Sequence, residues 1–288
     1  QCLGAGHASL FEEKPSLNWT QGWGYGGPWP IGPKWPATSV RNGQRAVVLQ
    51  NGTILSIGGG YETPNAAGDP GTPHGGSGVF ALDPGSTQMR EVILDGGFGA
   101  REEHCAVLLR GTSKVVLAGG RPLPQCAFNS NGCCDPGCYL SDAWTWDAKW
   151  TTNTTMKKWT ERTKTVPWDG CYLGDWYGGG PARTGIGCVS TNSTTVIAIG
   201  GMGGWSFDGP LDYEYATCKF NSVLRSTDSG ETWKKISGGK VKPPCNSTAG
   251  YTVLPLLSDI ACTYMPILKR IVVADASNVW VSDDEGVC

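Results

Sequence analysis

The stretch REEHCAVLLRGTSKVVLAGG, residues 101–120, decides the fold of this chain, because its plan occurs twice more. An arginine begins it, two short apolar segments follow on either side of a turn, and a Gly-Gly pair ends it. Residues 41–59 (RNGQRAVVLQNGTILSIGG) and 183–201 (RTGIGCVSTNSTTVIAIGG) have the same order. In chain order, the arginine precedes the first glycine of the pair by 17, 18 and 17 residues. Internal repeats of this kind indicate a fold that uses one supersecondary unit several times.

Each copy continues into a further strand with an apolar or aromatic centre. These strands are expected at 78–84, 141–147, 221–227 and 278–284. A Trp-led segment follows in the second and third copies, at 159–163 and 233–237, and Met89 opens the corresponding segment of the first. Four strands per copy, repeated around a ring, predict an all-β chain folded as a β-propeller of about four blades.

The fourth copy is degenerate. Cys262 precedes Ala274 by 12 residues, as Cys188 precedes Gly200. No outer strand follows in this copy, whereas residues 15–24 have the Trp-led pattern of such a strand. We therefore expect residues 15–24 to complete the last blade and close the ring within one chain. The alternative is that they pair with the open sheet edge of a neighbouring molecule.

The repeats divide the chain into two parts. Residues 1–40 form a segment rich in Gly, Pro and Trp that carries the closing or connecting strand, and residues 41–288 form the propeller domain. Long insertions at 61–77, 121–140 and 202–220, together with the first segment, leave room for a fifth blade.

Composition limits the class of protein. The chain has 288 residues, of which 43 are glycine and 19 are proline, and this content predicts short strands joined by tight turns. A net charge of −2 without a run of Lys or Arg excludes a nucleic-acid partner. No apolar stretch is long enough to span a bilayer, and a hydrophobic share of 39% excludes a disordered chain.

The cysteines indicate an oxidising compartment. Their spacing fits zinc sites poorly, and the chain has only 3 histidines, so we expect disulfides and no metal. Five N-x-Ser/Thr sequons and Gln1 as first residue also favour a secreted, N-glycosylated chain without its signal peptide. The cysteines are Cys2, Cys105, Cys126, Cys133, Cys134, Cys138, Cys171, Cys188, Cys218, Cys245, Cys262 and Cys288. The sequon asparagines are Asn18, Asn51, Asn153, Asn192 and Asn246.

At these residues the chain resembles two related propeller repeats. The order of arginine, Gly-Gly, aromatic strand and Trp-led strand is similar to kelch repeats. Residues 226–233 (STDSGETW) resemble the Asp-box, also called the BNR repeat, and 282–286 (SDDEG) resemble a truncated copy. The resemblance implies a β-propeller over roughly residues 40–288, with the Asp-box as a structural turn remote from an active site. Its residues are Ser226, Asp228, Gly230, Trp233, Ser282, Asp284 and Gly286.

The chemistry of the side chains predicts a structural role for three of these residues. The Asp228 carboxylate is expected to bind the backbone of the turn, Gly230 to take positive φ, and Trp233 to pack between strands.

Two sets of residues are candidates for ligand binding. The arginines that begin the repeats occupy equivalent positions, and their planar guanidinium groups suit a carboxylate at the mouth of a channel. The alternative is that they brace the inner strands. Tryptophans in Gly/Pro-rich loops suit stacking on sugars or anchoring a protein interface. The alternative is that they fill gaps between blades. The candidates are Arg41, Arg101, Arg183, Trp29, Trp35 and Trp176.

Enzymatic readings have less support. Some Asp-box proteins are sialidases, but the Phe/Tyr-Arg-Ile-Pro motif is absent and no Tyr–Glu pair can be identified. Copper oxidases of the galactose-oxidase type also use kelch propellers, but His74 and His104 lack a matching motif, and residues 102–104 are expected to form a solvated turn.

We therefore predict a secreted, non-catalytic β-propeller that acts as a structural or binding module in an extracellular assembly, without a cofactor. Its partners would be other protein subunits, including further copies of the chain, or glycans. The alternative is a carbohydrate-active enzyme such as a sialidase-like glycoside hydrolase.

Overall fold

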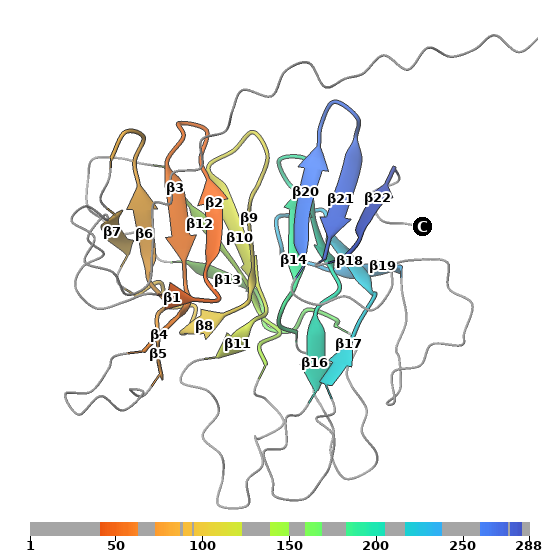
Figure 1. Ribbon diagram of the computed structural model, residues 1–288, viewed down its shortest axis with the longest axis horizontal. Coiled ribbons are helices and arrows are strands. Elements are labelled where there is room, and N and C mark those ends of the chain that lie inside the picture. The colour runs from red at the N-terminus through yellow and green to blue at the C-terminus, as the bar shows by residue number, and fades with distance from the viewer. Residues whose placement is uncertain are drawn as a thin grey trace, which may run out of the picture.

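The computed structural model forms strands and turns, and no helix, in the residues that it describes. These are residues 41–62, 73–86, 89–93, 95–122, 139–149, 159–168, 183–204, 217–237, 260–275 and 277–283. The segment 1–40, with its predicted closing strand, lies outside them. Figure 1 shows the strands of residues 45–82 (orange) and those of residues 261–282 (blue) at opposite sides of the view.

Three blades are complete antiparallel sheets of four strands. Blade 1 contains β2 (Arg45–Val48), β3 (Ile54–Ile57), β6 (Val79–Leu82) and β7 (Met89–Ile93). Blade 2 contains β9 (Cys105–Leu108), β10 (Lys114–Ala118), β12 (Ala143–Asp147) and β13 (Thr160–Thr163). Blade 3 contains β14 (Gly187–Ser190), β15 (Val196–Ile199), β18 (Val223–Ser226) and β19 (Lys234–Ser237).

The fourth blade has three described strands. They are β20 (Ala261–Met265), β21 (Arg270–Ala274) and β22 (Val279–Ser282), paired in that order. The all-β, four-blade propeller arrangement predicted from the repeats is confirmed. In the three complete blades the outer strand shifts register at the same place, after the first residue of the third strand.

Short ribbons occupy the described parts of the insertions at one end of the blades. They are formed by β1 (Arg41–Asn42), β4 (Gly60–Glu62) and β5 (Pro73–Gly75), by β8 (Arg101–Glu102) and β11 (Arg121–Pro122), and by β16 (Met202–Gly204) and β17 (Thr217–Lys219). The hairpin turns that join the two inner strands of each blade lie at the opposite end (Figure 1).

Apolar cores join successive blades. We call the face of a blade toward its predecessor the leading face, the face toward its successor the trailing face, and the contact between two blades a seam. Alternation along the strands supplies apolar side chains to both faces, and the innermost strands β2, β9, β14 and β20 lie side by side in this order. One pair from each seam core is Val79 with Leu117, Ala143 with Ala198, and Val223 with Ile271.

The Gly-Gly pair makes a backbone contact across the seam. The amide of Gly59 donates to the carbonyl of Arg101 in the next blade at 2.8 Å, and that of Gly120 donates to the carbonyl of Arg183 at 2.7 Å. The arginine side chain then holds its own blade, since Arg101 Nη1 donates to the carbonyl of Gly119 at 3.0 Å. This explains why an arginine and a Gly-Gly pair recur together at nearly constant spacing.

Glycine is required there for two reasons. Gly119 has φ +64°, a conformation that side chains disfavour. A Cβ on Gly119 would also lie 2.9 Å from the carbonyl oxygen of Arg183 and 2.7 Å from Cδ1 of Ile186. Any larger residue would push the two blades apart.

Blade 4 has an aspartate in place of the first glycine of this plan. Ala274 lies opposite Val279, as Ile199 lies opposite Val223, so Ala274 corresponds to the residue before the Gly-Gly pair. The alignment that matched Ala274 to Gly200 is therefore wrong by one residue. Asp275 stands at the first glycine position, and its amide donates to the Asn278 carbonyl, the bond that Gly58, Gly119 and Gly200 make at the same place in blades 1 to 3.

A disulfide crosses the seam between blades 2 and 3. Cys105 on the trailing face of β9 is bonded to Cys188 on the leading face of β14, with 5.7 Å between their Cα atoms. Cys262 occupies the position of Cys188 in blade 4 but faces Gly187, and it is a free thiol among the described residues. Burial raises the pKa of this thiol to about 12. The Cys218 side chain and Cys2, Cys126, Cys133, Cys134, Cys138, Cys171, Cys245 and Cys288 lie outside the described residues.

Replacing one glycine of the pair should separate the packing effect from the effect of φ. Gly119→Ala should destabilise the protein by about 3 kcal/mol, because a strained φ and an overpacked seam add up. Gly111→Ala is the matched control, since Gly111 has φ +72° and nothing within 4 Å of its Cβ position. It should cost about 1 kcal/mol. Equal losses of unfolding free energy for the two variants, measured by urea unfolding, would contradict the argument that Gly119 is needed for close packing at the seam.

Candidate functional site

The arginines at two repeat starts are enclosed within the propeller. Arg101 is 1% exposed, and Nη1 lies 2.6 Å from Oδ1 of Asp142. Arg183 is 0% exposed, donates to the carbonyl of Gly200 at 2.9 Å and lies 3.2 Å over the ring of Phe220. These are bracing contacts within the described structure.

Two of the three arginines predicted to bind a ligand, Arg101 and Arg183, therefore make contacts that hold strands together inside the propeller. A ligand carboxylate would reach neither Arg101 nor Arg183 without opening a blade. The side chain of Arg41 lies outside what the structure describes. A ligand-binding role for the three arginines stays a prediction.

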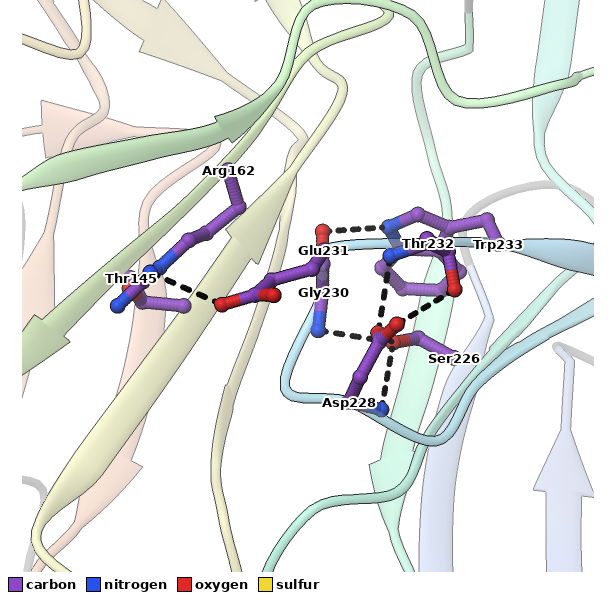
Figure 2. A network of polar contacts seen from close by, with 8 residues as sticks. All are labelled: Thr145, Arg162, Ser226, Asp228, Gly230, Glu231, Thr232 and Trp233. Atoms are coloured by element: carbon purple, nitrogen blue, oxygen red, sulfur yellow. Dashed lines mark hydrogen bonds and ion pairs between the residues drawn. The ribbon is translucent and has the colours of Figure 1, made fainter.

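The segment that resembles an Asp-box forms a closed turn between β18 and β19 (Figure 2). Ser226 Oγ accepts the Gly230 amide at 2.8 Å and donates to Asp228. Asp228 in turn accepts the Thr232 amide at 2.9 Å, and Trp233 Nε1 donates to the Gly230 carbonyl at 3.1 Å. Gly230 has φ +92°. The contacts expected of Asp228 and Gly230 are therefore present.

This turn also fastens blade 3 to blade 2. Glu231 Oε1 lies 3.0 Å from Nη1 of Arg162 on β13, and Arg162 Nε donates to Thr145 on β12 (Figure 2). The Cβ position of Gly230 is 3.2 Å from the side chain of Val116 on β10. The turn between β18 and β19 therefore also stabilises the contact between blades 2 and 3.

The His104 side chain is buried and fills the space beside Gly58 of blade 1. It is 0% exposed, and a Cβ on Gly58 would lie 2.7 Å from its ring. In the next blade Ile186 takes this position, against Gly119. Neither ring nitrogen has a hydrogen-bond partner in the described part of the chain. Burial, followed by the charges of Arg101 and Arg45, holds the pKa of His104 well below its usual range, so the ring is neutral.

The expectation of a solvated turn at residues 102–104 is wrong, because the next blades close over it. Glu102 is 6% exposed and accepts hydrogen bonds from Arg121. Glu103 has φ +54°, accepts the Thr184 hydroxyl at 2.9 Å, and links the backbones of three blades. Its amide donates to the carbonyl of Gly43, and its carbonyl accepts the amide of Gly185.

Two predicted glycosylation sites fall in the described structure. Asn51 and Asn192 are exposed at the inner hairpin turns of blades 1 and 3. Each side-chain oxygen accepts a backbone amide, from Thr53 at 3.1 Å and from Thr194 at 2.9 Å. A glycan attaches to the side-chain nitrogen, so both turns have an orientation that can carry one.

An open cleft of about 750 Å³ lies beside Asn51, between the hairpin ends of blades 1 and 2. Residues 49–51, 111–114 and 147–149 line it. Sequence reasoning missed this cleft because its three lining segments come from separate turns and carry no common motif.

The remaining predicted site residues lie outside the described residues. They are Trp29, Trp35, Trp176, Asn18, Asn153, Asn246, Asp284 and Gly286. Ser282 ends β22. Across the described ranges no group of His, Cys, Asp and Glu side chains is placed to hold a metal ion. The same ranges contain no helix with the length and apolarity to cross a membrane.

Comparisons with known proteins identify no family. No family model matches the chain, and no curated protein matches it. The solved structure titled "Structure of YjhT" is similar in fold, with 11% sequence identity and a TM-score of 0.48. The match covers 81% of this chain and 58% of that one.

Ser226→Ala should test the turn between β18 and β19. The substitution leaves the buried Gly230 amide without its acceptor, which should cost about 1–3 kcal/mol in urea unfolding. Glu231→Gln removes a partly exposed ion pair from the same turn and should cost less than about 1 kcal/mol. The reverse order of effects would show that the ion pair, and not the hydroxyl, holds the turn.

His104 should make folding stability depend on pH. Because its pKa is lower in the folded state than in the unfolded state, the unfolded chain takes up the proton first. Stability should be full above about pH 6.5 and decrease as the pH falls below that value. His104→Leu should flatten this part of the curve of unfolding free energy against pH. A curve unchanged by the substitution would assign the acid sensitivity to other groups.

Proposed function

We propose that this chain is a secreted, N-glycosylated propeller of the kelch and Asp-box kind that works as a non-catalytic binding or structural module in an extracellular assembly. Its partners are protein subunits or glycans. Glycans on Asn51 and Asn192 would lie at the hairpin end of the blades, where both side chains are exposed.

The observation that carries this proposal is the edge of β22 in blade 4, which no described strand pairs with. In blades 1 to 3 the third strand pairs with an outer strand, which uses the hydrogen-bonding groups of that edge. In the described part of blade 4, β22 pairs with β21 alone. An exposed strand edge is a template for pairing with a further strand, from the same chain or from a neighbour.

Residues 15–24 are the proposed occupant of that edge. They contain Trp19 followed by Thr20, as Trp159 is followed by Thr160 at the start of the outer strand of blade 2. Pairing in one chain would complete the blade, and pairing between chains would build an assembly.

The experiment compares the intact glycoprotein with a chain that lacks residues 1–24, by light scattering and small-angle X-ray scattering. If the strand joins molecules, the intact protein should be larger than one chain and the truncated protein should be monomeric. If the strand closes its own blade, both should be monomeric, and the truncated protein should unfold at lower temperature. Equal mass and equal stability would overturn the strand proposal, and turnover of a glycan by the purified protein would overturn the non-catalytic role.

A further inference from the structure

We propose that the hairpin turn of blade 4, residues 265–270, binds to a lipid surface that carries negative charge. This turn joins β20 to β21 and has the sequence Met-Pro-Ile-Leu-Lys-Arg. The inference goes beyond the proposed function, whose partners are proteins or glycans, and it does not depend on that function.

The inner hairpin of blade 4 is longer than those of the other blades. Its two strands form five residue pairs, the last of which joins Met265 to Arg270, whereas the inner strands of blades 1, 2 and 3 form four pairs each. In blades 1 and 2 the residue after the fourth pair is a leucine that folds into the protein, since Leu49 and Leu109 are 7% and 0% exposed. Met265 has the same position but is 41% exposed. The turn of blade 4 therefore presents to solvent a side chain that those blades bury.

The side chains of this turn are apolar and exposed together. Ile267 is 95% exposed, Leu268 is 53% exposed, and Pro266 is exposed beside them. The exposed positions in the inner turns of blades 1, 2 and 3 are instead polar or glycine. They are Gln50, Asn51, Gly52, Arg110, Gly111, Asn192, Ser193 and Thr194. Exposed apolar side chains that lie next to one another mark a site of contact with a protein or a membrane.

Basic side chains stand beside the apolar turn. Lys269 belongs to it, and the Arg110 guanidinium of blade 2 lies 5.7 Å from the ring centre of Tyr264, the residue before Met265. Arg270 is paired with Asp283, so its charge is compensated. Among the described residues no carboxylate forms an ion pair with Lys269 or Arg110. The turn therefore has positively charged surroundings, although the whole chain has a net charge of −2.

An anionic lipid surface matches this combination better than a protein partner does. Isoleucine and leucine partition favourably into hydrocarbon, and basic side chains beside them are attracted to anionic headgroups. A lysine can reach the headgroups while its neighbours enter the acyl region, because its stem is long and apolar. The energy of protein contacts comes mainly from Trp, Tyr and Arg, with leucine under-represented. The turn contains no aromatic side chain.

The form of the turn suits shallow insertion. Backbone N–H and C=O groups need hydrogen-bond partners in hydrocarbon, so the backbone of an irregular turn stays at the level of the headgroups. Pro266 removes one N–H donor from this turn. The side chains of Ile267 and Leu268 then enter the boundary between headgroups and acyl chains, as the apolar face of an interfacial helix does. Binding through a single turn of this kind is expected to be reversible.

The experiment is flotation of the intact protein with vesicles of phosphatidylcholine alone or mixed with phosphatidylserine. The protein should bind the mixed vesicles more strongly, and added salt should weaken that binding. Ile267→Asp should lower the affinity for the mixed vesicles by about tenfold or more, because a charge would enter the acyl boundary. The substitution should leave the fold intact, since Ile267 is 95% exposed. Lys269→Gln should reduce the preference for the mixed vesicles.

Val279→Asp is the matched control. Val279 is also exposed, at 66%, but it lies opposite Ala274 at the other end of the blade. This variant should bind vesicles as the unmodified protein does. Amide hydrogen exchange gives a second readout, in which the mixed vesicles should protect residues 265–270 and leave residues 49–53 and 191–195 unchanged.

Three results would overturn the proposal. The first is that the intact protein does not float with the mixed vesicles. The second is an equal loss of binding in Ile267→Asp and Val279→Asp. The third is self-association that Ile267→Asp abolishes in a protein that binds no vesicles, which would assign the turn to a protein contact.

Discussion

The hydrogen bonds that Gly59 and Gly120 donate to the arginine carbonyl of the next blade are the contacts on which the arrangement depends. They require the backbones of two sheets to approach more closely than a side chain allows, as the space around Gly119 shows. The same arginine then binds back to its own blade through its guanidinium group, as Arg101 does. The glycine and the arginine together thus set both the spacing between blades and the position of the inner strand.

Other features of the molecule act at the same seams. His104 and Ile186 fill equivalent positions against glycine, so an imidazole serves where an aliphatic side chain also fits. The Cys105–Cys188 disulfide crosses one seam, and the turn at Gly230 fastens that same pair of blades. In these contacts, polar residues of the repeat bind other residues of the propeller.

The first and last described blades differ in part from the two between them. Blade 4 has Asp275 at the first glycine position, and in the described structure β22 pairs with β21 alone. On the leading face of blade 1, Val48 is 59% exposed, whereas Ser56 and Phe80 are each 5% exposed. A strand edge without a pairing strand among the described residues, such as that of β22, is a template for a further strand.

By itself, the sequence determined the all-β repeat architecture, the strands of each blade and the turn around Asp228, since alternation, turn residues and local hydrogen bonds act over a few positions. Only the tertiary structure decided that Arg183 is enclosed, that His104 is neutral, and which cysteine Cys105 meets. Those outcomes depend on residues about 80 positions apart in the sequence meeting across a seam, as the separation of 83 in the disulfide illustrates. The sequence pattern of one blade gives no information about the surface of the next blade. That surface determines which side chains are buried and which cysteines pair.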